Sequence, residues 1–100
     1  MMNTRAVPRF HEKILAFPNG AYDVFYESKR YLMRKETLLD GKLVKVYARE
    51  LGGNNFISLN YYPLTADGLL KPCEMSDEKV ISFILDAEGC DNIRSKGETE

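Results

Sequence analysis

Cysteine, histidine and long apolar runs are all scarce in this chain of 100 residues. Two cysteines are too few for a disulfide framework, so we expect free thiols in a reducing, cytoplasmic setting. No stretch approaches the ~18 apolar residues that cross a bilayer, and the N-terminus lacks the apolar block of a secretory signal, which predicts no membrane partner. None of the common catalytic or cofactor motifs is present, and we expect no cofactor.

A strong excess of either charge is also missing, although charge is unevenly distributed. The net charge of −1 argues against a general polyanion binder. Residues 29–50 hold seven basic and three acidic side chains, whereas residues 74–100 hold eight acidic and three basic ones. We interpret both segments as solvated surfaces, with a basic patch that meets an anionic partner as the alternative.

The remaining composition is that of an ordinary globular domain. Hydrophobic residues make up 44% of the chain and charged residues 29%. A chain of this length is expected to form one domain and to bury more than about 60% of its unfolded surface. We predict a single domain over residues 1–90 and a flexible polar tail over residues 91–100.

The clearest local signal is Asp40-Gly41, which lies between two runs of strand-forming residues and predicts a tight hairpin. Pairing across this turn places Leu38 opposite Leu43 and sends Arg34 and Arg49 to the solvent side. The side chains predicted to face the core are Tyr31, Met33, Thr37, Val44, Val46 and Ala48, with Lys35 as the one misfit among them.

The other elements follow from alternation and turn chemistry. Residues 10–17 fit a strand or a short helix, and we favour a strand that pairs with residues 21–27. The same pattern predicts a further strand over residues 56–62 and a short edge strand over residues 69–73. It also predicts a helix over residues 77–87 that is capped by Ser76 and stopped by Gly89.

These elements predict an α+β fold. We expect a bent antiparallel meander of five or six strands, with a half-open barrel as the alternative, and one C-terminal helix packed on it. The apolar face of that helix is wider than a lone surface helix needs, so it must be covered.

Candidate catalytic and metal-binding residues are few. Cys73 directly precedes the predicted helix, where a lowered pKa would make it a reactive or redox-sensing thiol, and His11 is the only histidine to pair with it. The spacing of His11, Cys73 and Cys90 matches no usual zinc pattern. We therefore predict no catalytic residue and no metal site, and treat a Cys73 enzyme or redox sensor as an alternative.

Glycines and asparagines gather at Gly52, Gly53, Asn54 and Asn55. Phosphate-cradling loops lie between a strand and a helix, whereas a strand is predicted after this segment. We interpret it as a turn whose exposed amides form part of a binding rim.

Aromatic and basic residues are interleaved in the predicted hairpin, as in small sheets that bind single-stranded nucleic acid. The candidate binding residues are Lys29, Arg30, Arg34, Lys45, Tyr47 and Arg49. Our first hypothesis is a non-enzymatic module that binds another protein or itself as a homodimer, motivated by the wide apolar helix and the predicted edge strands. Single-stranded nucleic-acid binding through the hairpin is the alternative.

Overall fold

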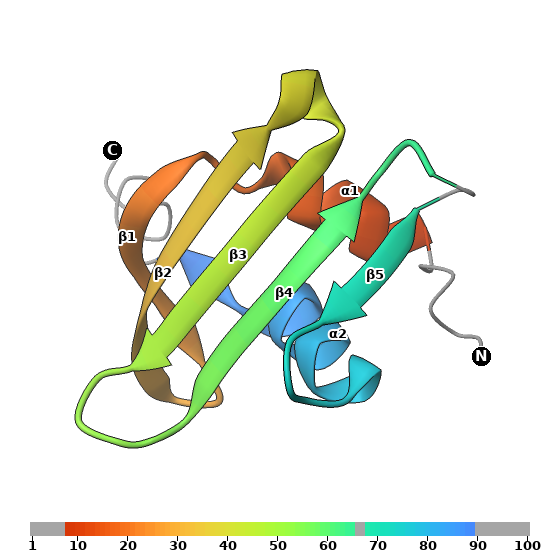
Figure 1. Ribbon diagram of the computed structural model, residues 1–100. Helices are drawn as coiled ribbons and strands as arrows, with labels where there is room; N and C mark the ends of the chain where they lie inside the picture. The colour runs from red at the N-terminus through yellow and green to blue at the C-terminus, as the bar shows by residue number, and fades with distance from the viewer. Residues whose placement is uncertain (1–7, 66–67, 90–100) are drawn as a thin grey trace.

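Alternating inward and outward side chains build a six-stranded antiparallel sheet in the computed structural model, which describes residues 8–65 and 68–89. The elements in chain order are α1 (Pro8–Ala16), β1 (Gly20–Tyr26), β2 (Lys29–Leu38), β3 (Leu43–Glu50), β4 (Phe56–Tyr62), β5 (Leu69–Pro72), α2 (Asp77–Asp86) and β6 (Glu88–Gly89) (Figure 1). The sheet order is β5-β4-β3-β2-β1-β6. The expected α+β class is confirmed, and the sheet stays open rather than closing into a barrel.

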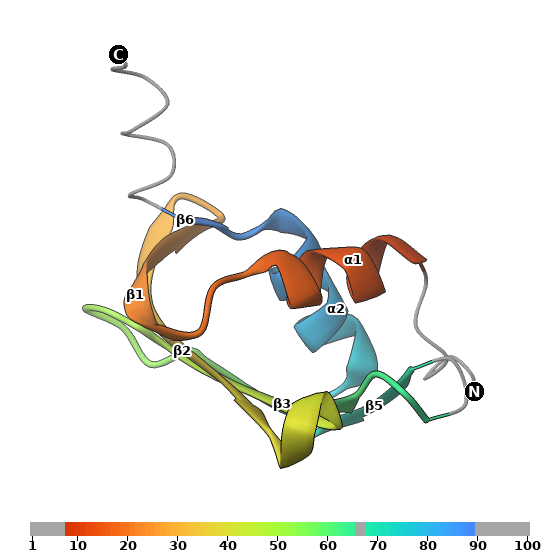
Figure 2. The ribbon, with the colours of Figure 1, turned by 90° about the horizontal axis from the view of Figure 1, so that it is seen from above.

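The two helices lie together on one side of the sheet, which bends around them (Figure 2). Between these layers lies a core built from both helices and from the inward residues of the strands. Its largest fully buried side chains include Tyr61, Phe10, Phe83, Ile14, Met33 and Ile57. No helix in the described ranges is long and apolar enough to cross a membrane. The predicted polar tail and Cys90 lie outside the described residues.

The β2–β3 hairpin has the predicted register, with Leu38 opposite Leu43. Leu39, Asp40 and Gly41 have left-handed φ values of 55°, 56° and 89°, and ψ of Asp40 is 40°. The turn is closed by Lys42 N–H, which donates to the carbonyl oxygen of Leu39 at 3.1 Å. Turn chemistry at two residues thus sets the pairing of the two longest strands.

The prediction of a strand over residues 10–17 was wrong, because this segment forms helix α1. Phe10, Ile14 and Phe17 recur at spacings of four and three residues, and all three are buried. That spacing is helical, and Pro8 suits the first position of a helix. Residues 8–65 and 68–89 therefore contain two α-helices, and β1 pairs with β2 instead of with residues 10–17.

Lys35, the misfit of the predicted inward face, is buried and is only 3% exposed. Its Nζ donates to the carbonyl oxygens of Leu15 at 3.2 Å and Phe17 at 2.5 Å. These carbonyls end α1, so the cation satisfies acceptors that the helix leaves open and complements the negative end of its dipole. Thr37, also predicted inward, is exposed and donates to the Asn19 side chain at 2.9 Å.

Helix α2 follows its prediction at the start and differs at the end. The Ser76 side chain accepts a hydrogen bond from Lys79 N–H at 3.1 Å, as expected of an N-cap. Gly89 does not stop the helix, because Ala87 is already extended and Gly89 pairs with β1 as part of β6. Val80, Phe83 and Ile84 are buried, so the wide apolar face is covered within the chain itself.

Candidate functional site

The sheet side opposite the helices is covered by no other element among the described residues (Figure 2). We call this surface the outer face. It is made of the side chains that alternate with the buried ones in β1 to β5. Its main members are Phe25, Arg30, Leu32, Arg34, Glu36, Leu38, Leu43, Lys45, Tyr47, Arg49, Phe56, Ser58, Asn60, Tyr62, Leu69 and Lys71.

Strand register arranges these side chains in rows across the sheet. One row joins Arg34, Tyr47 and Ser58. The next row on one side joins Leu32, Arg49 and Phe56. The next row on the other side is formed by Glu36, Lys45, Asn60 and Lys71. Because facing residues in adjacent strands lie about 4.5–5.5 Å apart at Cβ, each row is a continuous strip of functional groups.

Positive charge dominates the outer face, although the whole chain is slightly acidic. Its cations are Arg30, Arg34, Lys45, Arg49 and Lys71, against the carboxylates of Asp23 and Glu36. Arg30 is bound to Asp23 at 2.8 Å and lies over the Phe25 ring at 5.1 Å. Arg34, Arg49 and Lys71 have no ion pair with another described residue. These three cations are available to an anionic partner.

The Tyr47 ring lies in the middle of this charged surface, and the Phe56 ring lies beside it at the start of β4. Tyr47 is 46% exposed on β3, and its ring centroid is 6.2 Å from that of Phe56 on β4, with 32° between the ring planes. Lys79 approaches the Phe56 ring at 5.7 Å. A solvent-exposed ring on a central strand has no role in the core, and it offers a flat surface for stacking.

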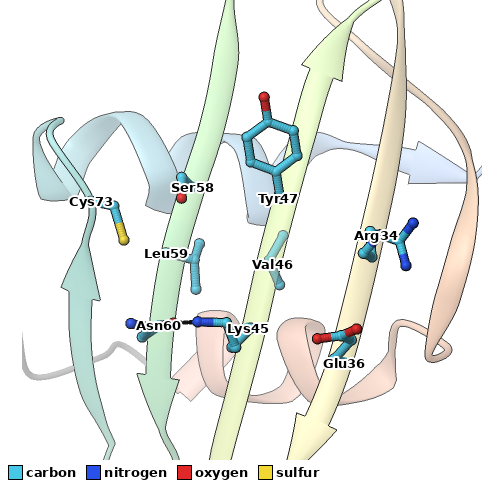
Figure 3. A pocket seen from close by; sticks show the side chains of 9 residues that line it. All are labelled: Arg34, Glu36, Lys45, Val46, Tyr47, Ser58, Leu59, Asn60 and Cys73. Atoms are coloured by element: carbon cyan, nitrogen blue, oxygen red, sulfur yellow. Dashed lines mark hydrogen bonds between the residues drawn. The ribbon is translucent and has the colours of Figure 1, made fainter.

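A depression of about 240 Å³ lies beside Tyr47 (Figure 3). Arg34, Tyr47 and Ser58 lie along one side of it and Glu36, Lys45 and Asn60 along the other, while Cys73 bounds it from the end of β5. Lys45 Nζ donates to the Asn60 side-chain oxygen at 3.1 Å. The depression is thus polar around its rim, with Val46 and Leu59 between the two rows.

The structure brings together five of the six predicted binding residues, namely Arg30, Arg34, Lys45, Tyr47 and Arg49. Lys29 is different, because strand alternation places it on the helix side of the sheet, where it pairs with Glu50 at 3.9 Å. Phe56 and Lys71 also belong to the outer face but were not among the predicted binding residues. The alternation that sends Ile57 and Leu70 inward sends these two residues outward, so the signal was present in the sequence.

The predicted turn at Gly52 to Asn55 does connect two strands, β3 and β4. Its conformation is tied to the Glu50 carboxylate, which accepts from Asn55 N–H at 3.3 Å and which a Cβ on Gly53 would strike. The Asn55 side-chain amide donates to the Tyr31 hydroxyl at 2.8 Å. A carboxylate enclosed by this turn makes it a poor rim for an anion.

Cys73 and His11 lie on opposite sides of the sheet. Cys73 lines the depression on the outer face, whereas His11 Nδ1 is 2.7 Å from the hydroxyl of the buried Tyr61 on the helix side. A cysteine–histidine pair is therefore not assembled. In the part of the chain that the structure describes, no cluster of three histidine, cysteine or carboxylate side chains is arranged to hold a metal ion.

Comparison of this chain with protein-family models, with curated proteins and with solved structures finds no match.

Proposed function

We propose that the protein is a non-enzymatic module that binds single-stranded nucleic acid on the outer face. The observation that carries this proposal is the exposed Tyr47 ring on a central strand, in a sheet face that neither helix covers. Arg34 and Arg49 lie beside it, and neither forms an ion pair with any residue of the described ranges. Bases stack on exposed rings, while arginine and lysine follow the phosphates. As part of the same proposal, we place the protein in the cytoplasm.

The arrangement favours a single strand over a duplex. Rings that protrude from a sheet face can stack only on bases whose faces are open, and in a duplex those faces are already stacked on each other. Tyr47 and Phe56 lie on neighbouring strands, so their ring centroids at 6.2 Å offer adjacent stacking surfaces. The cations on either side of them lie where a backbone passing over the rings would run.

The test is fluorescence anisotropy with labelled single-stranded oligonucleotides at several salt concentrations. If Arg34, Arg49 and Lys71 each neutralise one phosphate, the slope of log affinity against log salt is about −2. Tyr47→Ala removes a stacking surface and is expected to weaken binding by roughly tenfold or more. Arg49→Gln is expected to weaken binding and to make the slope shallower by about 0.7.

Lys29→Gln is the matched control, because it removes a cation of the neighbouring strand β2 that lies on the helix side of the sheet. Its affinity should stay close to that of the wild type. An unlabelled duplex should compete poorly. Absence of any oligonucleotide binding at low salt, or equal losses in Lys29→Gln and Arg49→Gln, would overturn the proposal.

Protein binding or self-association is a second candidate, favoured by an apolar end of the outer face. Leu38 and Leu43 face each other there, and Leu39 is 65% and Leu64 73% exposed. The wide apolar helix and the edge strands, which also suggested protein binding from the sequence, give it less support in the structure. The apolar face of α2 is covered, and β5 and β6, at the two sheet edges, have four and two residues.

Light scattering over a concentration series tests the homodimer version. Leu39→Ser, at an exposed position of the turn, should shift a dimer towards monomer without loss of folding. A wild-type chain that stays monomeric at high concentration would contradict self-association.

For the Cys73 alternative, the test is the alkylation rate of the thiol. A rate equal to that of a free-cysteine control would mean that the thiol is not activated.

A further inference from the structure

Glu36 is a negatively charged residue on a surface that is proposed to bind the phosphates of a nucleic acid. Its carboxylate is exposed in the depression beside Tyr47, between the cations Arg34 and Lys45. It forms no hydrogen bond or ion pair with another described residue. Lys45, which faces Glu36 across the β2–β3 pair, donates to Asn60 on its other side instead. A carboxylate placed there repels a phosphate, but it accepts hydrogen bonds from the edge of a base.

The size of the depression fits one base. At about 240 Å³ it lies below the range of roughly 300–1,000 Å³ that holds drug-sized ligands. Tyr47 lies at one side of it with its ring directed away from the depression, and the row with Glu36 and Lys45 lies at the other side (Figure 3). A base that stacks on the exposed Tyr47 ring and extends back over the depression would meet a carboxylate and an ammonium group that are cross-strand neighbours.

Guanine is the base whose edge matches this pair. Its Watson–Crick edge presents an acceptor oxygen, O6, followed by two adjacent donors, N1–H and N2–H. Adenine, cytosine and uracil each offer no more than one donor position on that edge. The Glu36 carboxylate can accept from both guanine donors at once, while Lys45 donates to O6.

We propose that the depression lined by Glu36, Lys45 and Tyr47 is a guanine-selective subsite for single-stranded nucleic acid. This inference rests on the proposed function and adds base selectivity to it. The other residues of the outer face contact the backbone or stack without reading the base. The protein thus binds single strands generally and prefers those with an accessible guanine.

The test uses nine-nucleotide oligouridine and oligothymidine probes with one central guanine, adenine or cytosine, or with no substitution. A single guanine avoids the association of guanine-rich strands, and the two backgrounds separate RNA from DNA. Anisotropy titration of the wild-type protein should give about tenfold tighter binding of the guanine probe than of the other three, the discrimination typical of a bidentate contact.

Glu36→Gln separates base reading from simple electrostatics. It removes a negative charge, so the unsubstituted probe should bind as well as before or more tightly. It also removes the second acceptor oxygen, so the preference for guanine should fall to nearly one. A purely structural role for Glu36 would lower both affinities together. Asp40→Asn is the matched control, since it removes a carboxylate at the exposed β2–β3 turn and asparagine tolerates its left-handed backbone.

The outcomes distinguish the two proposals. Equal binding of all four probes, preference for another base, or guanine preference that survives in Glu36→Gln would overturn the subsite while leaving single-strand binding in place. Failure to bind any probe at low salt would overturn both, and would favour a protein partner for the outer face.

Discussion

Lys35 shows how one side chain can contradict the pattern of its strand and still fit the fold. By alternation it faces the core, and its Nζ reaches the carbonyls of Leu15 and Phe17 at the end of α1. Desolvation by burial lowers the pKa of Lys35 below its usual value of 10.5. Lys35 therefore joins α1 to β2, but burying its charged form costs desolvation free energy. This cost depends on pH, because only the protonated amine carries the charge.

The pH dependence of this contact is a prediction for Lys35→Met. Because the folded pKa is lowered, the unfolded chain holds this proton more tightly between the folded pKa and 10.5. The contribution of Lys35 to the free energy of unfolding therefore rises as pH increases through that interval. Urea unfolding from pH 7 to 10.5 should show the wild type gaining stability relative to Lys35→Met.

The control for that comparison is Lys42→Met, which makes the same chemical change at an exposed position in the turn. Parallel pH profiles for the wild type and Lys35→Met would contradict the assignment of a buried, charged lysine at this position.

Tyr61 and His11 form a second contact at the residue scale. The Tyr61 hydroxyl lies 2.7 Å from His11 Nδ1, and its ring packs edge-on against Phe10 at 5.2 Å. Tyr61→Phe keeps the ring and removes the hydrogen bond, so we expect a loss of about 1 kcal/mol in the free energy of unfolding.

A double-mutant cycle checks this expectation. His11→Ala strands the buried hydroxyl and should cost about 1–3 kcal/mol, whereas in a Tyr61→Phe background the same change should cost less. Strictly additive losses would mean that the two groups do not interact.

At the scale of elements, the C-terminal end of each described helix has carbonyl oxygens that accept hydrogen bonds from a lysine elsewhere in the chain. Lys35 from β2 closes α1, and Lys13 from α1 donates to the carbonyls of Leu85 at 3.0 Å and Ala87 at 3.3 Å at the end of α2. Helix α2 has no basic residue in its own last turn. The two helices are thus held to the sheet and to each other by charge at their C-terminal ends as well as by apolar packing.

The start of α2 depends on its own cap. Ser76→Ala removes the acceptor for Lys79 N–H, and we expect it to lower the free energy of unfolding by about 1 kcal/mol. Ser82→Ala, at an exposed position inside the same helix, is the control and should be neutral or slightly stabilising, because alanine is the better helix former. Thermal unfolding followed by circular dichroism measures both. Equal effects of the two substitutions would argue against the cap.

For the whole molecule, the packing of two helices on a bent sheet buries Tyr26 and Tyr61 and half-buries Tyr22. Burial raises the pKa of Tyr22 to about 12, and burial is also the main cause of the raised pKa of Tyr26 and of Tyr61. Each of these phenols keeps its proton more firmly when the chain is folded.

Alkaline unfolding follows from these shifts. Below pH 10 the folded and unfolded phenols are both protonated, and above pH 10 the unfolded chain releases its protons first. The tyrosine contribution to the free energy of unfolding is therefore lost as pH rises from about 10 towards 12. Denaturant unfolding across this range should show a decline that is smaller in Tyr22→Phe. An unchanged slope in that variant would contradict the protected position of Tyr22.

Much of the sheet was predictable from local sequence. Asp40-Gly41 encodes its own left-handed turn, and that turn fixes which residues of β2 and β3 alternate inward. The same period places Val44 and Val46 in the core and leaves Arg34 and Arg49 exposed. Residues 10–17 were misassigned, because a short apolar segment next to a turn fits either period and tertiary packing decides between them.

The candidate site depends more on long-range packing. Turn chemistry and side-chain period act over a few residues, and so they determine the strands, the outward residues and the cap of α2. Three other features join segments that are far apart in the chain. Both helices pack on the same side of the sheet, and Lys35 donates to carbonyls at the end of α1. Glu36, Tyr47 and Cys73 line one depression. Such arrangements depend on burial of the common core, a free energy that no single segment contains.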